Sequence, residues 1–261
     1  MSKFNSNLVL ILALTGTFIW NAGYGQRIDS MTNKQSMDKK MQEEYRLRND
    51  WADLERFKIA NAELPAPVPG ENRVIFMGNS ITQGWIDMVP EFFKGKAFIN
   101  RGIGGQTTPQ MLVRFRPDVV DLKPRVVVIL AGTNDIAGNT GPVSLDNIIG
   151  NIKSMAELAK VNGVAVVISS ILPVYDYPWK KGLNPVEKIA LINSKLRVYA
   201  QEHGMVYLDY YASMADENKG LRKELTYDGV HPNRAGYAVM QPLAEQAIRA
   251  ALAIGRKRQF K

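Results

Sequence analysis

The chain has 261 residues, of which 33 are Lys or Arg and 25 are Asp or Glu, so its formal net charge at pH 7 is +8. It contains 46% hydrophobic residues, 22% charged residues and no cysteine, which excludes collagen-like, disordered and disulfide-stabilised proteins as well as cysteine nucleophiles and thiolate zinc sites. The length suits one α/β domain of about 200–250 residues, and the two histidines, His203 and His231, are the only candidates for an imidazole base.

Residues 1–25 have the pattern of a secretory signal peptide. Lys3 precedes an apolar stretch over 8–20, and small residues follow up to Gly25. The apolar stretch is shorter than the roughly 20 residues that a membrane span needs. We expect cleavage after Gly25, no stable membrane anchor, and a secreted or periplasmic protein. The alternatives are an uncleaved anchor and a buried helix.

Residues 26–70 form a charged segment and a connector before the main domain. The connector is the segment LPAPVPG at 64–70, whose alternating prolines predict extended chain. The charged segment predicts an amphipathic helix packed on the main domain. Its apolar residues recur at helical spacing: Leu47, Trp51, Leu54 and Phe57.

From residue 71 to 254, short apolar runs alternate with longer amphipathic stretches. The runs lie at 74–77, 97–99, 126–131, 164–171 and 206–208, and the amphipathic stretches at 82–93, 108–116, 145–161, 185–202 and 234–253. Continuous apolar runs are typical of strands buried on both faces. The alternation therefore predicts right-handed βαβ units and a three-layer α/β/α domain. The residues after it, 255–261, form a basic tail that we expect to be solvated and disordered.

Polar residues follow three of the predicted strands, at the sheet edge where α/β proteins bind ligands. Ser80 lies at a strand-to-helix turn, where it either serves a developing oxyanion or only caps the helix. The glycines at 102–105 either bring backbone N–H groups close to a ligand or form a tight turn. The amide of Asn134 can donate to an oxyanion, or Asn134 and Asp135 can form an Asx turn or a helix cap.

A fourth polar block precedes the last predicted helix. Asp228 and His231 lie three residues apart in a loop bounded by glycine and proline, a spacing that lets the carboxylate hold the imidazole. His203 lies before a glycine at a predicted helix end, where a histidine interacts favourably with the helix dipole. We therefore interpret His231 as the base and His203 as structural.

The four blocks in this order resemble the SGNH hydrolase superfamily, also called GDSL-like lipases and acylhydrolases. The resemblance extends from about residue 73 to 254 and implies a flavodoxin-like sandwich with a five-stranded parallel sheet. The motif Gly-Asp-Ser-Leu of the family is Gly-Asn-Ser-Ile at residues 78–81 here. Asn79 thus replaces an acid by an amide that keeps its hydrogen-bonding shape without its charge.

The resemblance implies a serine esterase mechanism that needs neither metal nor cofactor. Ser80 is the expected nucleophile, with His231 as base and Asp228 as the third member of the triad. The N–H groups of Ser80 and Gly105 and the amide of Asn134 are the expected oxyanion hole, with Gly104 the less favoured alternative to Gly105. The form of the motifs is closest to the platelet-activating-factor-acetylhydrolase-like and carbohydrate-esterase branches, which implies short acyl groups, acetyl foremost, on small-molecule or glycan esters.

Two other functions are consistent with the sequence. One is a lysophospholipase or another lipid-ester hydrolase; the other, of a different class, is a non-catalytic carbohydrate-binding or flavodoxin-like binding module. Tyr175, Tyr177 and Trp179 follow the fourth strand and could stack on a sugar, line an acyl channel or pack under a loop. No basic stripe interleaved with aromatic residues is present, which argues against nucleic-acid binding. The oligomeric state is not predicted.

Overall fold

The computed structural model describes residues 37–42 and 44–259, and the side chains of all of these except 256–259. The predicted signal peptide lies outside the described residues. Within them, no helix combines the length and the apolar character that a membrane span requires. The chain divides into two compact units, one ending at Trp51 and the other extending from Ala52 to Lys261.

The segment predicted as one amphipathic helix is interrupted. Residues 37–42 and 44–49 are helical, and the chain then turns at 50–53, where Asp53 has a left-handed backbone with φ 57°. A 3₁₀ helix, η1 (Leu54–Phe57), and a short helix, α2 (Lys58–Ala62), follow. The apolar spacing continues across this turn, which is why the sequence pattern alone predicted a single helix. Packing of the first helical segment on the second unit stays a prediction.

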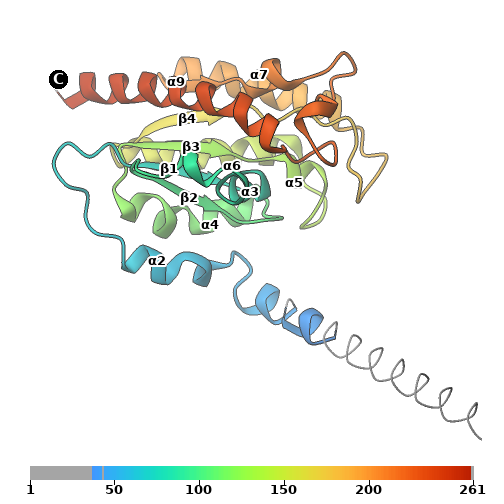
Figure 1. The fold of residues 1–261 in the computed structure, drawn as a ribbon. Helices are drawn as coiled ribbons and strands as arrows, with labels where there is room; N and C mark the ends of the chain where they lie inside the picture. The colour runs from blue at the N-terminus through green and yellow to red at the C-terminus, as the bar shows by residue number, and fades with distance from the viewer. Residues whose placement is uncertain (1–36, 43, 260–261) are drawn as a thin grey trace, which may run out of the picture. The chain divides into compact units, whose positions relative to one another are not determined.

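A five-stranded parallel sheet lies at the centre of the second unit (Figure 1). Its strands are β1 (Val74–Gly78), β2 (Phe98–Gly102), β3 (Val126–Leu130), β4 (Ala165–Ser169) and β5 (Val206–Leu208), in the order β2-β1-β3-β4-β5. Every residue of β1, β3 and β4 is buried. All five strands start or end within a few residues of the predicted apolar runs. The signal is clearest for β1, β3 and β4, because a strand covered on both faces is apolar along its whole length.

Helices cover both faces of the sheet, which confirms the three-layer α/β/α architecture. One face packs against α4 (Thr108–Asp118), α6 (Leu145–Val161) and α7 (Pro185–Glu202), and the other against α3 (Ser80–Met88), α8 (Tyr210–Met214) and α9 (Arg234–Gln259). Alternate residues of each strand point to opposite faces. Ile75 and Met77 of β1 join the first cluster, for example, and Val74 and Phe76 join the second.

The described part of the basic tail, residues 255–259, is helical and not disordered as expected. Helix α9 continues past the predicted end of the domain and reaches Gln259. Gly255 is inside it, and the first part of the helix is anchored by buried residues such as Met240 and Ile248. A helix that is fixed by packing in its first turns adds further residues at little extra cost, since each new residue gains a backbone hydrogen bond.

The glycine at the end of β2 allows helix α3 to approach the sheet closely. An ideal Cβ at Gly102 would lie 2.2 Å from the backbone nitrogen of Gln83 in α3, closer than real atoms come. Gly102 is also paired with Gly78 at the end of β1. Any larger residue at 102 would push the start of α3 away from the strand ends, and Ser80 is the first residue of that helix.

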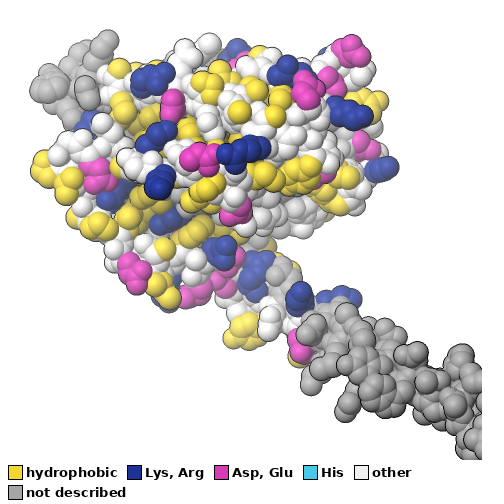
Figure 2. Space-filling model, viewed as in Figure 1, with side chains coloured by type: hydrophobic (Ala, Val, Ile, Leu, Met, Phe, Trp, Pro, Cys, Tyr) yellow, Lys and Arg dark blue, Asp and Glu magenta, His cyan; other side chains and the backbone are white. Residues whose placement is uncertain are grey.

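Charges on the molecular surface are mixed. On the face drawn in Figure 2, Lys and Arg side chains are interspersed with Asp and Glu and with small hydrophobic areas. Several ion pairs join the two signs, among them Lys96 with Glu245 and Lys195 with Asp146, at 2.6 and 3.0 Å. Such exposed pairs each contribute little to stability.

Candidate active site

The strand order places the reversal point of the sheet at the carboxyl ends of β1 and β3. In the order β2-β1-β3-β4-β5, the connections from these two adjacent strands leave toward opposite faces of the sheet, and ligands of such folds bind at this reversal point. Ser80 follows β1 after a single residue. Asn134 follows β3 and lies in the four-residue helix α5 (Thr133–Ile136). The predicted residues therefore meet at the expected edge of the sheet.

A chain of hydrogen bonds joins Ser80 to Asp228 through His231. The hydroxyl Oγ of Ser80 lies 2.9 Å from Nε2 of His231, and Nδ1 of the same ring lies 2.6 Å from Oδ2 of Asp228. A carboxylate can only accept, so the ring proton is on Nδ1 and Nε2 is left to accept the Ser80 proton. Ser80 and His231 are 151 positions apart in the chain. The structure thus brings together the predicted serine, histidine and aspartate.

The loop that carries Asp228 and His231 is fixed by its own hydrogen bonds. Oδ1 of Asp228 accepts from the backbone N–H groups of Val230 and His231, at 2.9 and 2.7 Å. The hydroxyl of Thr226 donates to the carbonyl of His231 at 2.7 Å and accepts from the N–H of Gly229. Burial alone would raise the pKa of Asp228, but the backbone N–H and the ring of His231, with the N–H of Val230, lower that pKa below its ordinary value. Asp228 is therefore ionised at neutral pH.

Asn79 takes the position where the family has an acid. Its Oδ1 accepts from the backbone N–H of Ile81 at 3.1 Å and caps helix α3, and the residue is buried. An amide oxygen accepts this bond as a carboxylate oxygen would. The substitution therefore preserves the helix start that positions Ser80, and it places no charge in the buried position.

The glycine loop after β2 lies beside Ser80. An ideal Cβ on Gly104 would lie 3.9 Å from Cβ of Ser80. The N–H of Gly104 already donates to Oε1 of Gln83 at 2.7 Å. Gly105 has a left-handed backbone with φ 75°, and among the described residues its N–H makes no hydrogen bond. The structure thus favours Gly105 over Gly104 as a donor to a ligand.

Asn134 bonds to this same loop and does not cap a helix. Its Nδ2 donates to the carbonyl of Gln106 at 2.9 Å, which leaves the second N–H of the amide to another acceptor. The neighbouring Asp135 accepts from the N–H and the hydroxyl of Thr108 at the start of α4. Burial raises the pKa of Asp135, and these two bonds oppose that rise. Asp135 therefore serves helix α4, whereas the Asn134 amide faces the glycine loop.

A buried polar cluster, which the sequence did not indicate, holds the two loops. Arg114 is fully buried, and its guanidinium donates to the carbonyl of Gly78, to Oε1 of Gln106 at 2.5 Å and to Asp118 at 2.9 Å. It thereby connects the residue before Asn79 to the residue that binds the Asn134 amide. The sequence gives no sign of this role, because an arginine within a helix is usually exposed. The role is recognised only from the contacts that Arg114 makes in the folded chain.

His203 has the structural position predicted for it. It is the C-cap of α7, its Nδ1 lies 2.9 Å from the carbonyl of Tyr199, and its ring lies 4.1 Å from the Tyr199 ring. The carbonyl and the ring both belong to Tyr199, in the last turn of the same helix. His203 has no contact with the serine or the aspartate described above, which leaves His231 as the imidazole of the site.

The three aromatic residues after β4 differ in their exposure. Of the alternatives open for Tyr177, the structure shows packing rather than contact with a ligand: the residue has no exposed surface, and its hydroxyl donates to the carbonyl of Thr133 at 2.9 Å. The ring therefore packs inside the protein against the residue before Asn134 and is not available to a ligand. Tyr175 and Trp179 are 66% and 47% exposed. A further exposed ring, Tyr227, directly precedes Asp228 and was not singled out from the sequence. Its position next to the Asp-x-x-His motif could have identified it as a site residue.

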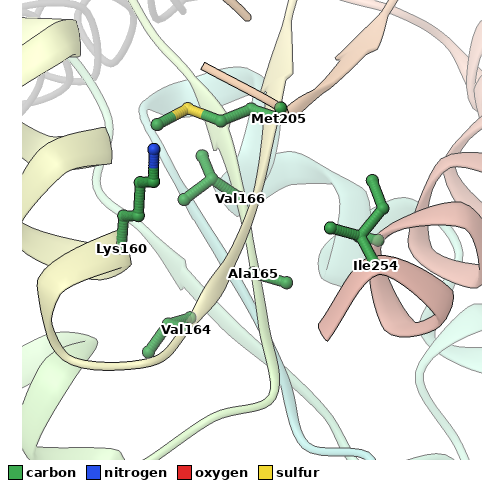
Figure 3. Close-up of a pocket in the computed structure, with 8 residues that line it drawn as sticks. Lys160, Val164, Ala165, Val166, Met205 and Ile254 are labelled. Atoms are coloured by element: carbon green, nitrogen blue, oxygen red, sulfur yellow. The ribbon is translucent and has the colours of Figure 1, made fainter. Parts of the chain in front are cut away.

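Two cavities lie at different distances from this edge. The one in Figure 3 is at the amino ends of β4 and β5, between residues such as Val164, Met205 and Ile254, and its volume of about 10 Å³ holds no more than one water. A larger cavity, about 370 Å³, has Asp135, the residue after Asn134, in its lining, but none of Ser80, Gly105, Asn134 and His231. Its lining is mainly apolar, with two lysines: Ile136, Ala137, Pro142, Val143, Leu145, Leu183, Lys180 and Lys188.

Comparisons with known proteins match this fold and these motifs. The family model described as GDSL-like Lipase/Acylhydrolase family matches residues 76–239. The crystal structure of a putative acylhydrolase from Bacteroides fragilis NCTC 9343 is 50% identical, with a TM-score of 0.77, and the match covers 78% of this chain and 99% of that one.

Two curated relatives are more distant. Platelet-activating factor acetylhydrolase IB subunit alpha2 from Homo sapiens is 27% identical over 183 residues, which are 67% of this chain and 76% of the relative. An uncharacterized lipoprotein from Bacillus subtilis (strain 168) is 29% identical over 124 residues. That match covers 41% of this chain and about half (51%) of the lipoprotein.

Proposed function

The chain belongs to the GDSL-like lipase/acylhydrolase family of carboxylic ester hydrolases, and we propose that it hydrolyses short-chain acyl esters, acetyl esters foremost, with Ser80 as nucleophile. The observation that carries this proposal is the continuous hydrogen-bonded chain from Ser80 through His231 to Asp228, at 2.9 and 2.6 Å. In a serine esterase such a chain activates the hydroxyl.

The first step is attack of Ser80 on the ester carbonyl. Nε2 of His231 takes the hydroxyl proton while Oγ bonds to the carbonyl carbon. The resulting imidazolium is stabilised by Asp228, whose lowered pKa keeps it ionised beside the ring. Asp228 also fixes the ring in the orientation that leaves Nε2 facing Ser80.

The carbonyl oxygen becomes an oxyanion, and three donors are available to stabilise it. Ser80 is the first residue of α3, so its N–H has no acceptor within the helix. Gly105 and Asn134 follow β2 and β3 at the same edge of the sheet, and among the described residues the N–H of Gly105 and the second N–H of the Asn134 amide have no acceptor. Donors that are already oriented before the reaction cost no reorganisation when the charge develops.

Collapse of the tetrahedral intermediate releases the alcohol, which takes its proton from His231. The acyl group stays on Ser80 as an ester. A water molecule then gives one proton to His231 and attacks the acyl carbon. His231 passes this proton to Ser80 as the carboxylic acid leaves, and the acid then ionises in solvent. The cycle restores the protonation of all three residues.

The acyl group is the part of the substrate for which two proposals compete. The family resemblance favours acetyl, whereas the mainly apolar cavity of about 370 Å³, which has Asp135 in its lining, favours a longer apolar chain, as in a lipid ester. A series of esters from acetyl to octanoyl decides between them. We expect the highest kcat/KM on acetyl or propionyl and a drop by octanoyl; a maximum at octanoyl that a Val143→Phe variant abolishes would favour the lipid ester.

The experiment that tests the function is acetate release from a panel of acetylated glycans and lysophospholipid-like esters. We expect release from the glycans by the full chain and none by Ser80→Ala. Absence of turnover on every acetyl ester would overturn the proposal and favour a binding module.

We also propose that the protein is secreted or periplasmic after removal of residues 1–25. The support is the order of charge, apolar stretch and small residues in the sequence. N-terminal sequencing of the protein from culture medium or periplasm tests this, with Gln26 expected as the first residue.

A further inference from the structure

Two exposed aromatic rings flank the imidazole of His231. The ring of Tyr227 is nearly parallel to it, at 9° and 5.8 Å between centroids, and the ring of Trp179 lies at 36° and 5.9 Å. They come from different loops, one before Asp228 and one after β4. Tyr227 is 62% exposed and Trp179 47%. Both therefore present large apolar faces to solvent at the reacting edge.

Packing stability does not require this exposure. A ring that stabilises the fold gains its energy by burial, as Tyr177 does on the same loop as Trp179. Tyr227 leaves most of its area in water instead, in direct ring contact with His231. Exposed aromatic faces that gather around a reactive group mark a surface where a ligand completes the burial.

The chemistry of the proposed reaction specifies which part of the ester these rings would contact. His231 must donate a proton from Nε2 to the leaving alcohol, so that oxygen has to come within about 3.2 Å of Nε2. The oxyanion donors, Gly105 and Asn134, are on the acyl side. Groups that flank the imidazole therefore contact the alcohol part of the substrate.

We propose that Tyr227 and Trp179 form a platform for a sugar ring, so that the alcohol part of the substrate is a pyranose that bears the acyl ester. This inference rests on the proposed esterase function. The C–H groups on one face of a pyranose are slightly positive and match the negative face of an aromatic ring. The flat shape of the sugar fits beside an imidazole that must still reach the ester oxygen.

Aromatic clusters also bind quaternary ammonium groups, and the ionised Asp228 directly follows Tyr227. The test therefore includes a choline ester as the competing substrate.

The test compares two acetyl esters that differ only in the alcohol: a monoacetylated xyloside and ethyl acetate. The measured quantity is the ratio of their kcat/KM values. Both are obtained with the full-length protein by measuring the release of acetate. Tyr227→Leu removes the ring but keeps an apolar side chain, and Tyr227→Phe keeps the ring. We expect the ratio to fall about tenfold in Tyr227→Leu and to stay within about twofold of wild type in Tyr227→Phe. Trp179→Leu should lower it in the same direction.

Tyr175→Leu is the matched control, because Tyr175 is equally exposed but lies against the turn at Gly220, where an ideal Cβ would be 3.0 Å from its own. The ratio should change less in Tyr175→Leu than in Tyr227→Leu. An equal fall in both variants, or an unchanged ratio in Tyr227→Leu, would overturn the platform. A wild-type preference for acetylcholine over the xyloside would overturn it as well.

Failure of the esterase function gives a different result from failure of the platform. If the wild-type chain hydrolyses neither ester, the proposed function is wrong. If it hydrolyses both, and the Tyr227 variants lower both rates equally, the function stands and the platform is wrong. Titration of Ser80→Ala with an unacetylated xylo-oligosaccharide adds a binding measurement without turnover, in which we expect Tyr227→Leu to weaken the affinity about tenfold.

Discussion

Replacing Asp228 by asparagine tests the carboxylate that holds the imidazole. Oδ1 of Asp228 accepts from two backbone N–H groups, those of Val230 and His231. In Asp228→Asn these donors require the amide oxygen at the same position, so the amide NH₂ must take the place of Oδ2. It then faces Nδ1 of His231, 2.6 Å away in the wild-type chain. Since an NH₂ group only donates, Nδ1 has to become the acceptor and the ring proton moves to Nε2.

The moved proton blocks the first step of the reaction. With a proton on Nε2, the ring donates to Ser80 across the 2.9 Å contact and cannot take the hydroxyl proton. The same substitution in the triad of a serine protease lowers kcat about 10⁴-fold. We expect a loss of about 10³–10⁴-fold here, which corresponds to roughly 4–5.5 kcal/mol of transition-state stabilisation. The assay is kcat on an aryl acetate, with a melting curve of each variant.

Asp216→Asn is the matched control. Oδ1 of Asp216 also accepts from two backbone N–H groups, those of Asn218 and Gly220, and no imidazole contacts it. Its replacement should leave kcat within about twofold of wild type. If folded Asp228→Asn kept a tenth or more of the wild-type kcat, the argument from the fixed amide orientation would be refuted.

Three further outcomes follow from the site. Asn134→Ala should lower kcat about 10²–10³-fold if the amide stabilises the oxyanion; if it only bonds Gln106, stability falls by about 1 kcal/mol and kcat barely changes, and kinetics beside a melting curve separate the two. His231→Ala should nearly abolish turnover, whereas His203→Gln should keep kcat within a small factor and only lower the melting temperature; reversed effects would disprove the assignment of the base. Because the pKa of Asp228 is lowered in the folded chain, its ionised form stabilises the fold above the unfolded value of about 3.9, and this contribution disappears as pH falls through the folded pKa; the difference in unfolding free energy between wild type and Asp228→Asn, from urea titrations, should therefore shrink from pH 7 to pH 3.

The architecture was predictable because its signals are local. Strands covered on both faces, such as β3 over Val126–Leu130, are apolar at every position, and the long helices begin at residues with clear capping or proline signals, as α7 does at Pro185. The predicted boundaries of α6 and α7 agree with the structure. The short helices α5 and α8 were missed, because four or five residues carry no periodicity.

The parts of the site that depend on tertiary contact were not predictable. The sequence contained no signal that Tyr177 would turn inward to bond Thr133 while Trp179, two residues on, stays exposed. It likewise contained no signal that Arg114 would reach the carbonyl of Gly78 from helix α4. The motif residues were found because their spacing along the chain resembles a family, whereas the residues that support them are recognised only by what they touch.

The most direct test of the account is covalent labelling by a serine-reactive phosphonate. The full chain is incubated with the reagent, and intact mass and peptide mapping locate the adduct. We predict one adduct per chain, on Ser80, none in Ser80→Ala, and slow labelling in His231→Ala, because Nε2 of His231 must remove the hydroxyl proton. An adduct on a different serine, or turnover of aryl acetate by well-folded Ser80→Ala, would contradict the assignment of Ser80 as the nucleophile.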